Sequence, residues 1–275
     1  MIADNLKNLK RKKHLRFISL LFIIIFSAGY LSLLGLGASK VYASGMLGFE
    51  VKGGAYFQNL TGHFEVGGSV GGIGPTDITP SDIGLQTTKT EPMLKAVLYI
   101  LYNNRISFTY VPYEYSGSKV LSQNVYFNGQ EYTAAAQVNS KLDLYSYKLF
   151  YDHNFEINRY ASVGLGAGVD VITTKTELDS ALLSESKTVN LPIPLVGGRI
   201  KISPLNNISF IGKLQGFTIG SKGYYYHVNA GVNYKAVGPL SIFADYVYDK
   251  IHVDASNVSG SIEFNGPEVG LRLRF

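Results

Sequence analysis

The residues of this chain that could catalyse acid–base chemistry gather near its C-terminal end. Asp249, His252 and Asp254 lie close together in the sequence. A carboxylate that faces an imidazole can activate water for hydrolysis. Acidic residues at the end of a strand are also ordinary solvated surface, so a protease remains a minor alternative. A lipid hydrolase, which needs a Ser nucleophile within reach of His, is equally minor because His227 has no Ser at a suggestive spacing.

Metal and cofactor chemistry have still less support in the sequence. The histidines His63, His153, His227 and His252 are isolated and lack the paired spacing of a metal site. The chain contains no Cys, which excludes disulfides, thiolate metal ligands and a lipidated N-terminal Cys. We therefore expect no catalytic residue, no metal and no cofactor.

The dominant pattern that could position any such residue is an alternation of apolar and polar residues. From Tyr224 to Lys235, one set of alternate residues is apolar or aromatic and the other set is mostly polar. Successive side chains of a strand point to opposite faces, so this pattern predicts a strand with one apolar and one polar face. The glycines from Gly164 to Gly168 lie within a similar pattern, where they leave room inside a narrow barrel rather than form a nucleotide loop.

The alternation predicts an all-β chain of about ten antiparallel strands, with eight possible. Most of these strands exceed the ~9–11 residues that a tilted strand needs to cross a bilayer. Short connections alternate with longer ones, which is typical of an up-and-down transmembrane β-barrel with external loops on one side. The strands are predicted at 46–58, 91–102, 105–117, 138–152, 159–174, 188–202, 206–220, 223–235, 239–252 and 259–275. The external loops are predicted near 59–90, 118–137, 174–187 and 251–259.

The N-terminal segment is predicted to be a cleaved signal peptide at residues 1–43. A basic stretch precedes an apolar run from Phe17 to about Leu36, and cleavage is expected between Ala43 and Ser44. An uncleaved anchor is the alternative. The whole chain has 25 basic and 20 acidic residues and a formal charge of +5. Removal of seven basic residues and one acidic residue leaves 25 − 7 = 18 against 20 − 1 = 19. The basic balance thus belongs to the leader and gives no argument for nucleic-acid binding.

Residues 44–275 are expected to form a monomeric barrel in the cell outer membrane, with membrane lipids around its apolar face. A soluble barrel would instead turn its apolar face inward. The opposite face is rich in Gly, Lys, Asp and Asn, and aromatic residues gather towards strand ends, which favours lipid outside. The parity of the strands places twelve charged or titratable residues in the lumen. They are Lys95, Lys148, Asp170, Arg199, Lys201, Lys213, His227, Asp245, Asp249, Glu268, Arg272 and Arg274.

The last strand has the form of an assembly signal. Val269, Leu271, Leu273 and the terminal Phe275 share one face. A closing amphipathic strand that ends in Phe resembles the signal read by the outer-membrane assembly machinery, which makes that machinery an expected partner.

Several short stretches resemble a family of small proteobacterial outer-membrane β-barrel proteins. They include the start from Leu47 to Val51, the stretch from Gly53 to Tyr56, the hairpin at Phe127 to Gly129 and the end from Gly270 to Phe275. A more distant likeness is to small barrels of the OmpW and OmpA type. The resemblance implies an outer-membrane barrel and brings no catalytic residues.

The expected function is a structural or narrow small-solute channel role. The alternatives are a surface-binding or adhesion barrel that acts through its external loops and, less favoured, a barrel enzyme such as an omptin-like protease or a lipid A or phospholipid hydrolase. Charges of both signs in the lumen fit either a salt-bridged plug or a polar pore.

Overall fold

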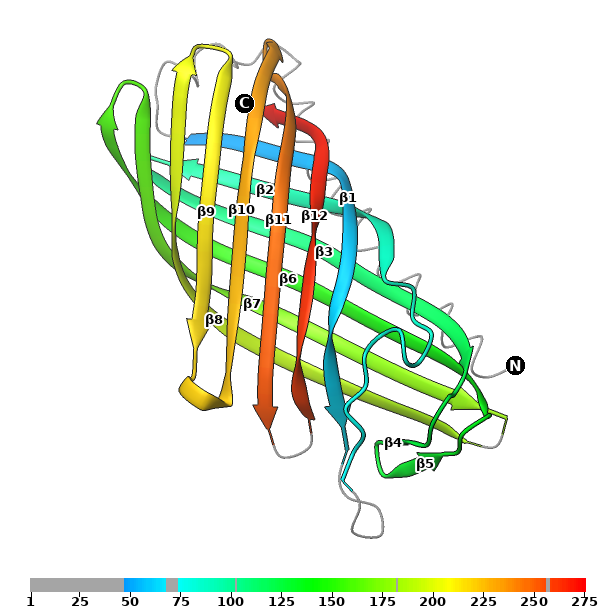
Figure 1. Cartoon of the computed structure of the whole chain (residues 1–275). Coiled ribbons are helices and arrows are strands. Elements are labelled where there is room, and N and C mark those ends of the chain that lie inside the picture. Colours follow the sequence, from blue (N-terminus) through cyan, green and yellow to red (C-terminus); the bar gives the residue numbers. More distant parts are fainter. Residues whose placement is uncertain (1–46, 68–73, 102, 182, 256–257) are drawn as a thin grey trace.

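The computed structural model describes residues 47–67, 74–101, 103–181, 183–255 and 258–275. Within these residues, ten strands close one antiparallel barrel in the order β1-β12-β11-β10-β9-β8-β7-β6-β3-β2 (Figure 1). A separate two-stranded hairpin pairs β4 with β5. No described helix is long and apolar enough to cross a membrane. The predicted all-β, up-and-down barrel is confirmed.

All ten predicted barrel strands are present, and several run further than predicted. Their bounds are β1 Leu47–Val66, β2 Thr88–Ile100, β3 Asn104–Val120, β6 Gln137–Asn158, β7 Ala161–Ser180, β8 Ser184–Leu205, β9 Ile208–Thr218, β10 Gly223–Val237, β11 Leu240–Ala255 and β12 Val258–Arg274. A 3-10 turn, Gly220–Lys222, joins β9 to β10. The proposed leader, its cleavage point between Ala43 and Ser44, and residues 68–73 lie outside the described residues.

The predicted alternation of short and longer connections holds only for the first part of the barrel. At one end, which we call the turn end, the strands are joined by residues 101–103, 159–160, 206–207 and 238–239. At the opposite end, the loop end, residues 67–87 and 121–136 form the two longer connections. The loops expected near 174–187 and 251–259 are much shorter, because β7, β8, β11 and β12 continue into those ranges.

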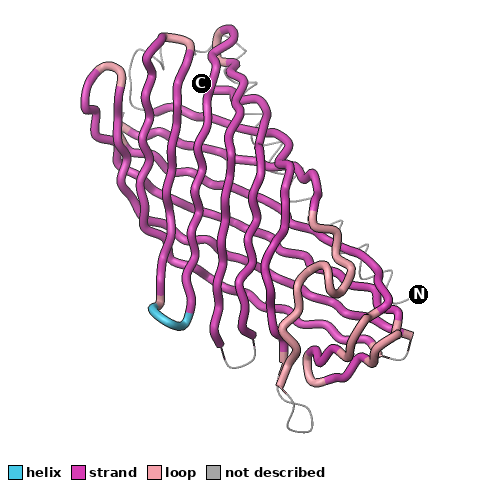
Figure 2. Tube along the Cα trace, in the orientation of Figure 1, coloured by secondary structure: helices cyan, strands magenta, loops and turns pink. Residues whose placement is uncertain are grey.

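The loop-end connections are themselves ordered where they are described. The hairpin of β4 (Val125–Phe127) and β5 (Gln130–Tyr132) turns at Asn128 and Gly129, both with positive φ, as the two-residue turns that suit β-hairpins require. Residues 74–87 precede β2 in the chain and lie between β1 and β3 on the loop-end side of Thr88 (Figure 2). They pair with β1 at Phe64–Ile78 and with β3 at Leu85–Gly117. This segment therefore extends the wall towards the loop end beyond β2.

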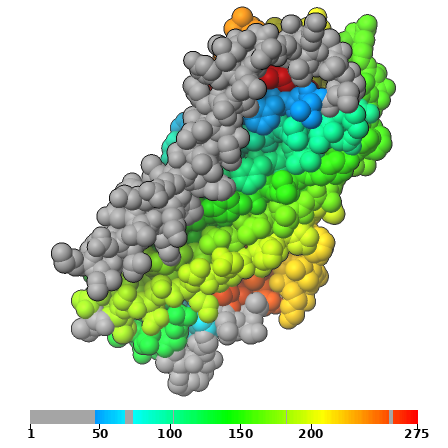
Figure 3. Space-filling view, turned by 180° about the vertical axis from the view of Figure 1, so that it is seen from behind, coloured from blue at the N-terminus to red at the C-terminus, as the bar shows by residue number. Residues whose placement is uncertain are grey.

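The outer surface of the barrel is apolar over a broad belt. Leu149, Leu165, Val196, Leu214 and Leu271 are each about half exposed, although a soluble protein would bury most such residues. Figure 3 shows the wall from behind, with β6, β7 and β8 running obliquely across it. The buried face between these residues is largely polar near the turn end. This arrangement is the one that a membrane barrel adopts, and it agrees with the predicted orientation.

Candidate functional site

The interior of the barrel contains two zones of opposite chemistry. The zone towards the turn end holds a network of charges that we call the polar plug. It comprises Glu50, Lys52, Arg105, Lys148, Asp152, Asp170, Arg199, His227, Asp245, Asp249 and Arg272. The zone towards the loop end is apolar and contains a cavity.

Asp249 on β11 is the centre of the part of the plug that lies nearer the loop end. Its carboxylate accepts hydrogen bonds from the hydroxyls of Tyr225, at 2.7 Å, and Tyr113, at 3.2 Å. His227 Nδ1 lies 2.8 Å from its Oδ1, and Lys148 Nζ lies 4.0 Å away. Lys148 also donates to the Tyr225 hydroxyl, at 2.8 Å. Side chains from β3, β6, β10 and β11 thus meet at one carboxylate inside the barrel.

Lys148 also reaches a second carboxylate at the same level. Its Nζ lies 3.7 Å from Asp170 Oδ2, and Ser146 donates to both oxygens of Asp170. Asp170 is fully buried. A buried charge requires partners of this kind, since an unpaired one costs several kcal/mol.

The part of the plug nearer the turn end consists of ion pairs between side chains of different strands. Lys52 Nζ lies 2.8 Å from Asp245 Oδ2 and 3.7 Å from the centre of the Phe243 ring. Asp152 contacts two guanidinium groups, with Arg105 Nε at 3.0 Å and Arg199 Nε at 3.7 Å. A polar cavity of about 40 Å³ lies between Lys52 and the group around Asp249, with Lys148 and His227 also in its lining. A space of that size holds only a few water molecules.

The structure places all twelve residues that parity assigned to the lumen on the inward face. Lys95, Lys148, Asp170, Arg199, Asp245, Asp249 and Glu268 are buried, and Lys201, Lys213, His227, Arg272 and Arg274 are half-buried. Sequence reasoning missed four charged members, Glu50, Lys52, Arg105 and Asp152, although each lies on a predicted strand or next to one. The parity rule, applied to the whole of the strands predicted at 46–58, 105–117 and 138–152, would have found them.

The protease candidate does not assemble. Asp249 points into the barrel, whereas His252 stacks on Tyr224 with a centroid distance of 5.0 Å, on the opposite face of the strand. Asp254 is exposed. His153 contacts Asn104 and Phe155 rather than a Ser. No group of three or more potential ligands among the described residues could hold a metal ion.

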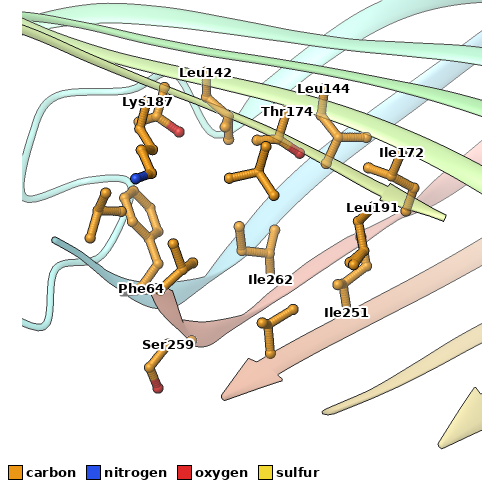
Figure 4. A pocket seen from close by; sticks show the side chains of 16 residues that line it. Phe64, Leu142, Leu144, Ile172, Thr174, Lys187, Leu191, Ile251, Ser259 and Ile262 are labelled. Carbon is orange, nitrogen blue, oxygen red and sulfur yellow. The ribbon is translucent and has the colours of Figure 1, made fainter. Parts of the chain in front are cut away.

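The apolar zone forms a pocket of about 360 Å³ at the loop end, which we call the mouth pocket. Side chains from β6, β7 and β8 face side chains from β1, β11 and β12 across it (Figure 4). Its apolar lining is Phe64, Val66, Leu142, Leu144, Ile172, Val189, Leu191, Ile251, Val253, Val258 and Ile262. Polar groups are few and include Thr174, Lys187 and Ser259.

This pocket was not predicted from the sequence. Ile251 and Val253 lie on the same face of β11 as Asp245 and Asp249, so the inward face changes from charged to apolar along a single strand. The outward face changes in the opposite sense on β7, from Val171 to Lys175 and Glu177. This inversion marks the level at which the strands leave the lipid.

The segment over residues 74–87 is held by local contacts outside the apolar belt. Asp82 accepts hydrogen bonds from the Thr79 backbone N, at 2.9 Å, and from the Thr79 hydroxyl, at 2.6 Å. These hydrogen bonds favour the charged carboxylate and lower the pKa of Asp82 below its ordinary value. Ser140 donates to the Ile83 carbonyl and anchors the same segment on β6.

Comparisons with known proteins agree with the fold. No family model matches the chain, and neither does any curated protein sequence. Among solved structures, the outer membrane protease OmpT from Escherichia coli matches with a TM-score of 0.54 and 9% identity, over 84% of this chain and 97% of that one. The translocator domain of the autotransporter NalP from Neisseria meningitidis matches with a TM-score of 0.42 and 10% identity, over 90% and 97%. Neisserial surface protein A matches with a TM-score of 0.37 and 14% identity, over 82% and 97%.

At these identities the likeness to OmpT concerns the fold and carries no activity with it. The closed antiparallel barrel, the exposed apolar belt and the polar interior agree with that likeness. The chain is a transmembrane β-barrel of the outer-membrane type.

Proposed function

We propose that this barrel takes up a small apolar molecule from the cell exterior in its mouth pocket. The observation that supports the proposal is the apolar lining of a lumen that is otherwise polar. Ligand pockets typically measure 300–1,000 Å³ and are mostly apolar with a few polar groups, which is the composition seen here. Lys187 stands among the lining residues, where its charge would attract a ligand with an anionic end.

The polar plug argues against a simple water-filled pore as the route for a solute. Its ion pairs lie in the lumen between the mouth pocket and the turn end. The cavity beside them measures only about 40 Å³. A structural role for the plug and a binding role for the mouth pocket together account for both zones. This narrows the small-solute role expected from the sequence to an apolar solute that does not cross the plug.

The absence of Trp from the chain permits a direct test. Ile262→Trp places a unique fluorophore in the pocket, and Phe210→Trp places one on the exposed outer face. Each variant is refolded in lipid vesicles and titrated with 1-bromonaphthalene, which quenches Trp on contact. We expect saturable quenching of Ile262→Trp, and quenching of Phe210→Trp that only follows partition of the probe into lipid.

A second substitution identifies the pocket as the binding site. Leu144→Asn, added to Ile262→Trp, should weaken binding about tenfold, because an unpaired amide in an apolar site costs about 1–3 kcal/mol. Val120→Asn, at an exposed position near the same end of the barrel, is the matched control and should leave the affinity unchanged. Quenching of Ile262→Trp that never saturates, or that ignores Leu144→Asn, would overturn the proposed function.

A further inference from the structure

The ladder between β8 and β9 stops short of the loop end. Strands β8 and β9 pair from Leu205–Ile208 to Val196–Gly216, where their register ends. Strand β8 continues to Ser184 and stays paired with β7 throughout. Among the described residues, no strand pairs with the other edge of residues 184–195. Figure 1 shows β8 and β9 running apart towards this end.

The free edge of β8 carries two prolines, Pro192 and Pro194. Proline has no backbone N–H and is found in sheets at edges, where it does not interrupt the ladder. Strand β7 pairs across this segment without a register shift, with Val171 opposite Pro192 and Val169 opposite Pro194. The prolines are therefore compatible with an edge that remains open, and they remove donors that would need partners in lipid.

A third cavity, of about 80 Å³, lies at this opening. Pro192 and Pro194 line it from β8, Phe217 lines it from β9, and Ile219 follows directly after β9. Leu191, Ile251 and Val253 line both this cavity and the mouth pocket. The two cavities are thus adjacent and share an apolar wall.

The opening lies at the loop-end limit of the apolar belt. Outward residues of β8 are polar from Ser184 through Asn190 and become apolar from Pro192 to Val196 and Ile202. Phe217 and Ile219, on the other side of the opening, are exposed. An apolar molecule that left the mouth pocket here would therefore meet the hydrocarbon of the membrane rather than water.

We propose that the space between β8 and the β9–β10 turn is a lateral port that connects the mouth pocket with the outer leaflet of the membrane. Its ligand class is that of the pocket, a small apolar molecule, and this inference rests on the proposed function. The port provides the exit that the polar plug denies to the ligand along the barrel axis.

Lipids with brominated acyl chains test whether the port is open to the bilayer. Phe217→Trp places the fluorophore in the port, Phe210→Trp places it on the outer face, and Phe150→Trp places it at a buried interior position. We expect brominated lipid to reduce the emission of Phe217→Trp nearly as much as that of Phe210→Trp, and to leave Phe150→Trp almost unaffected. Emission from Phe217→Trp that behaves like Phe150→Trp would show that the port is closed to lipid.

A reversible block tests passage through the port. The chain has no Cys, so Ile219→Cys in the Ile262→Trp background gives a unique thiol at the port. It is labelled with a bulky methanethiosulfonate in detergent, before reconstitution. Leu214→Cys, on the outer face of the paired part of β9, is the matched control.

We expect the label at Ile219→Cys to slow, severalfold, the quenching of Ile262→Trp by 1-bromonaphthalene already dissolved in the vesicle lipid. Dithiothreitol should restore the rate, and the final extent of quenching should not change. The label at Leu214→Cys should have no effect. An unchanged rate with saturable quenching would overturn the port and leave the mouth pocket standing, whereas quenching that does not saturate would overturn the proposed function itself.

Discussion

Asp249 and His227 face each other across the β10–β11 ladder, with Nδ1 of the imidazole 2.8 Å from Oδ1 of the carboxylate. The pair lies in the barrel interior, where Tyr113, Tyr225 and Lys148 complete the contacts of the carboxylate. Side chains from four strands thus meet at this carboxylate.

Removal of the Asp249 carboxylate should destabilise the barrel strongly. Breaking a buried ion network typically costs about 3–5 kcal/mol, because the partners remain buried without compensation. We expect Asp249→Ala to lower the free energy of unfolding by roughly that amount, measured by urea titration in lipid vesicles. Asp254→Ala, at an exposed position on the same strand, is the control and should have little effect. Equal stability of the two variants would contradict the role of the plug.

The purified protein should give no steady single-channel conductance in planar bilayers. The reason is that ion pairs from Lys52–Asp245 to Lys148–Asp170 fill the lumen. The double variant Arg105→Ala/Asp152→Ala removes the Arg105–Asp152 pair and the contact of Asp152 with Arg199. It should admit ions more readily than the native chain. A reproducible ohmic conductance of the unmodified protein would show that the plug is open.

The outward face of β10 should not tolerate charge. Ala230 is exposed on the apolar belt, between Val228 and Val232. Ala230→Arg should cost roughly 2–4 kcal/mol near the middle of the bilayer, because nothing solvates the guanidinium there. Ala230→Leu is the control and should be nearly neutral, and urea unfolding in vesicles measures both. Equal tolerance of Arg and Leu would mean that this face does not meet lipid.

The closing strand should carry the assembly signal expected from the sequence. Val269, Leu271 and Leu273 are exposed on the outer face of β12, and the backbone of Phe275 pairs with Phe49, with N–O distances of 2.8 and 2.9 Å. We expect Phe275→Ser to lower the amount of protein that reaches the outer membrane, without reducing export. Cell fractionation measures it, and Leu205→Ser at a turn-end position is the control. Normal insertion of Phe275→Ser would contradict the assembly signal.

The turn at Asp82 should loosen in acid. The pKa of Asp82 is lowered by its hydrogen bonds with Thr79, so the stabilisation is present above the ordinary carboxyl pKa near 4 and is lost as the pH falls through the lower, folded value. Limited pepsin digestion between residues 74 and 87 should accelerate over that range. Asp82→Asn should show faster digestion at higher pH and a weaker pH dependence. Identical profiles would show that the carboxylate does not hold the turn.

The sequence predicted the barrel because lipid imposes a simple alternation on strands such as β10, with Val228 outside and Asn229 inside. The predicted strands were too short because the polarity of the inward and outward faces inverts beyond the membrane, towards the loop end. On β7, Thr173, Lys175 and Glu177 point outward beyond Val171, a pattern that looks like a polar loop. The same inversion hid the mouth pocket, since Leu191 and Ile251 share a phase with charged residues.

The inversion of polarity along the strands also fixes the shear of the barrel. In a membrane barrel that is polar inside at every level, a slip of two residues between neighbours preserves the inward and outward sets and is only weakly opposed. Here a slip of β11 towards the turn end would carry Ile251 towards the level of Asp170, and a slip towards the loop end would carry Asp249 towards the level of Leu144. A slip in either direction therefore carries a penalty. The boundary between the plug and the pocket thus helps to fix the register between adjacent strands.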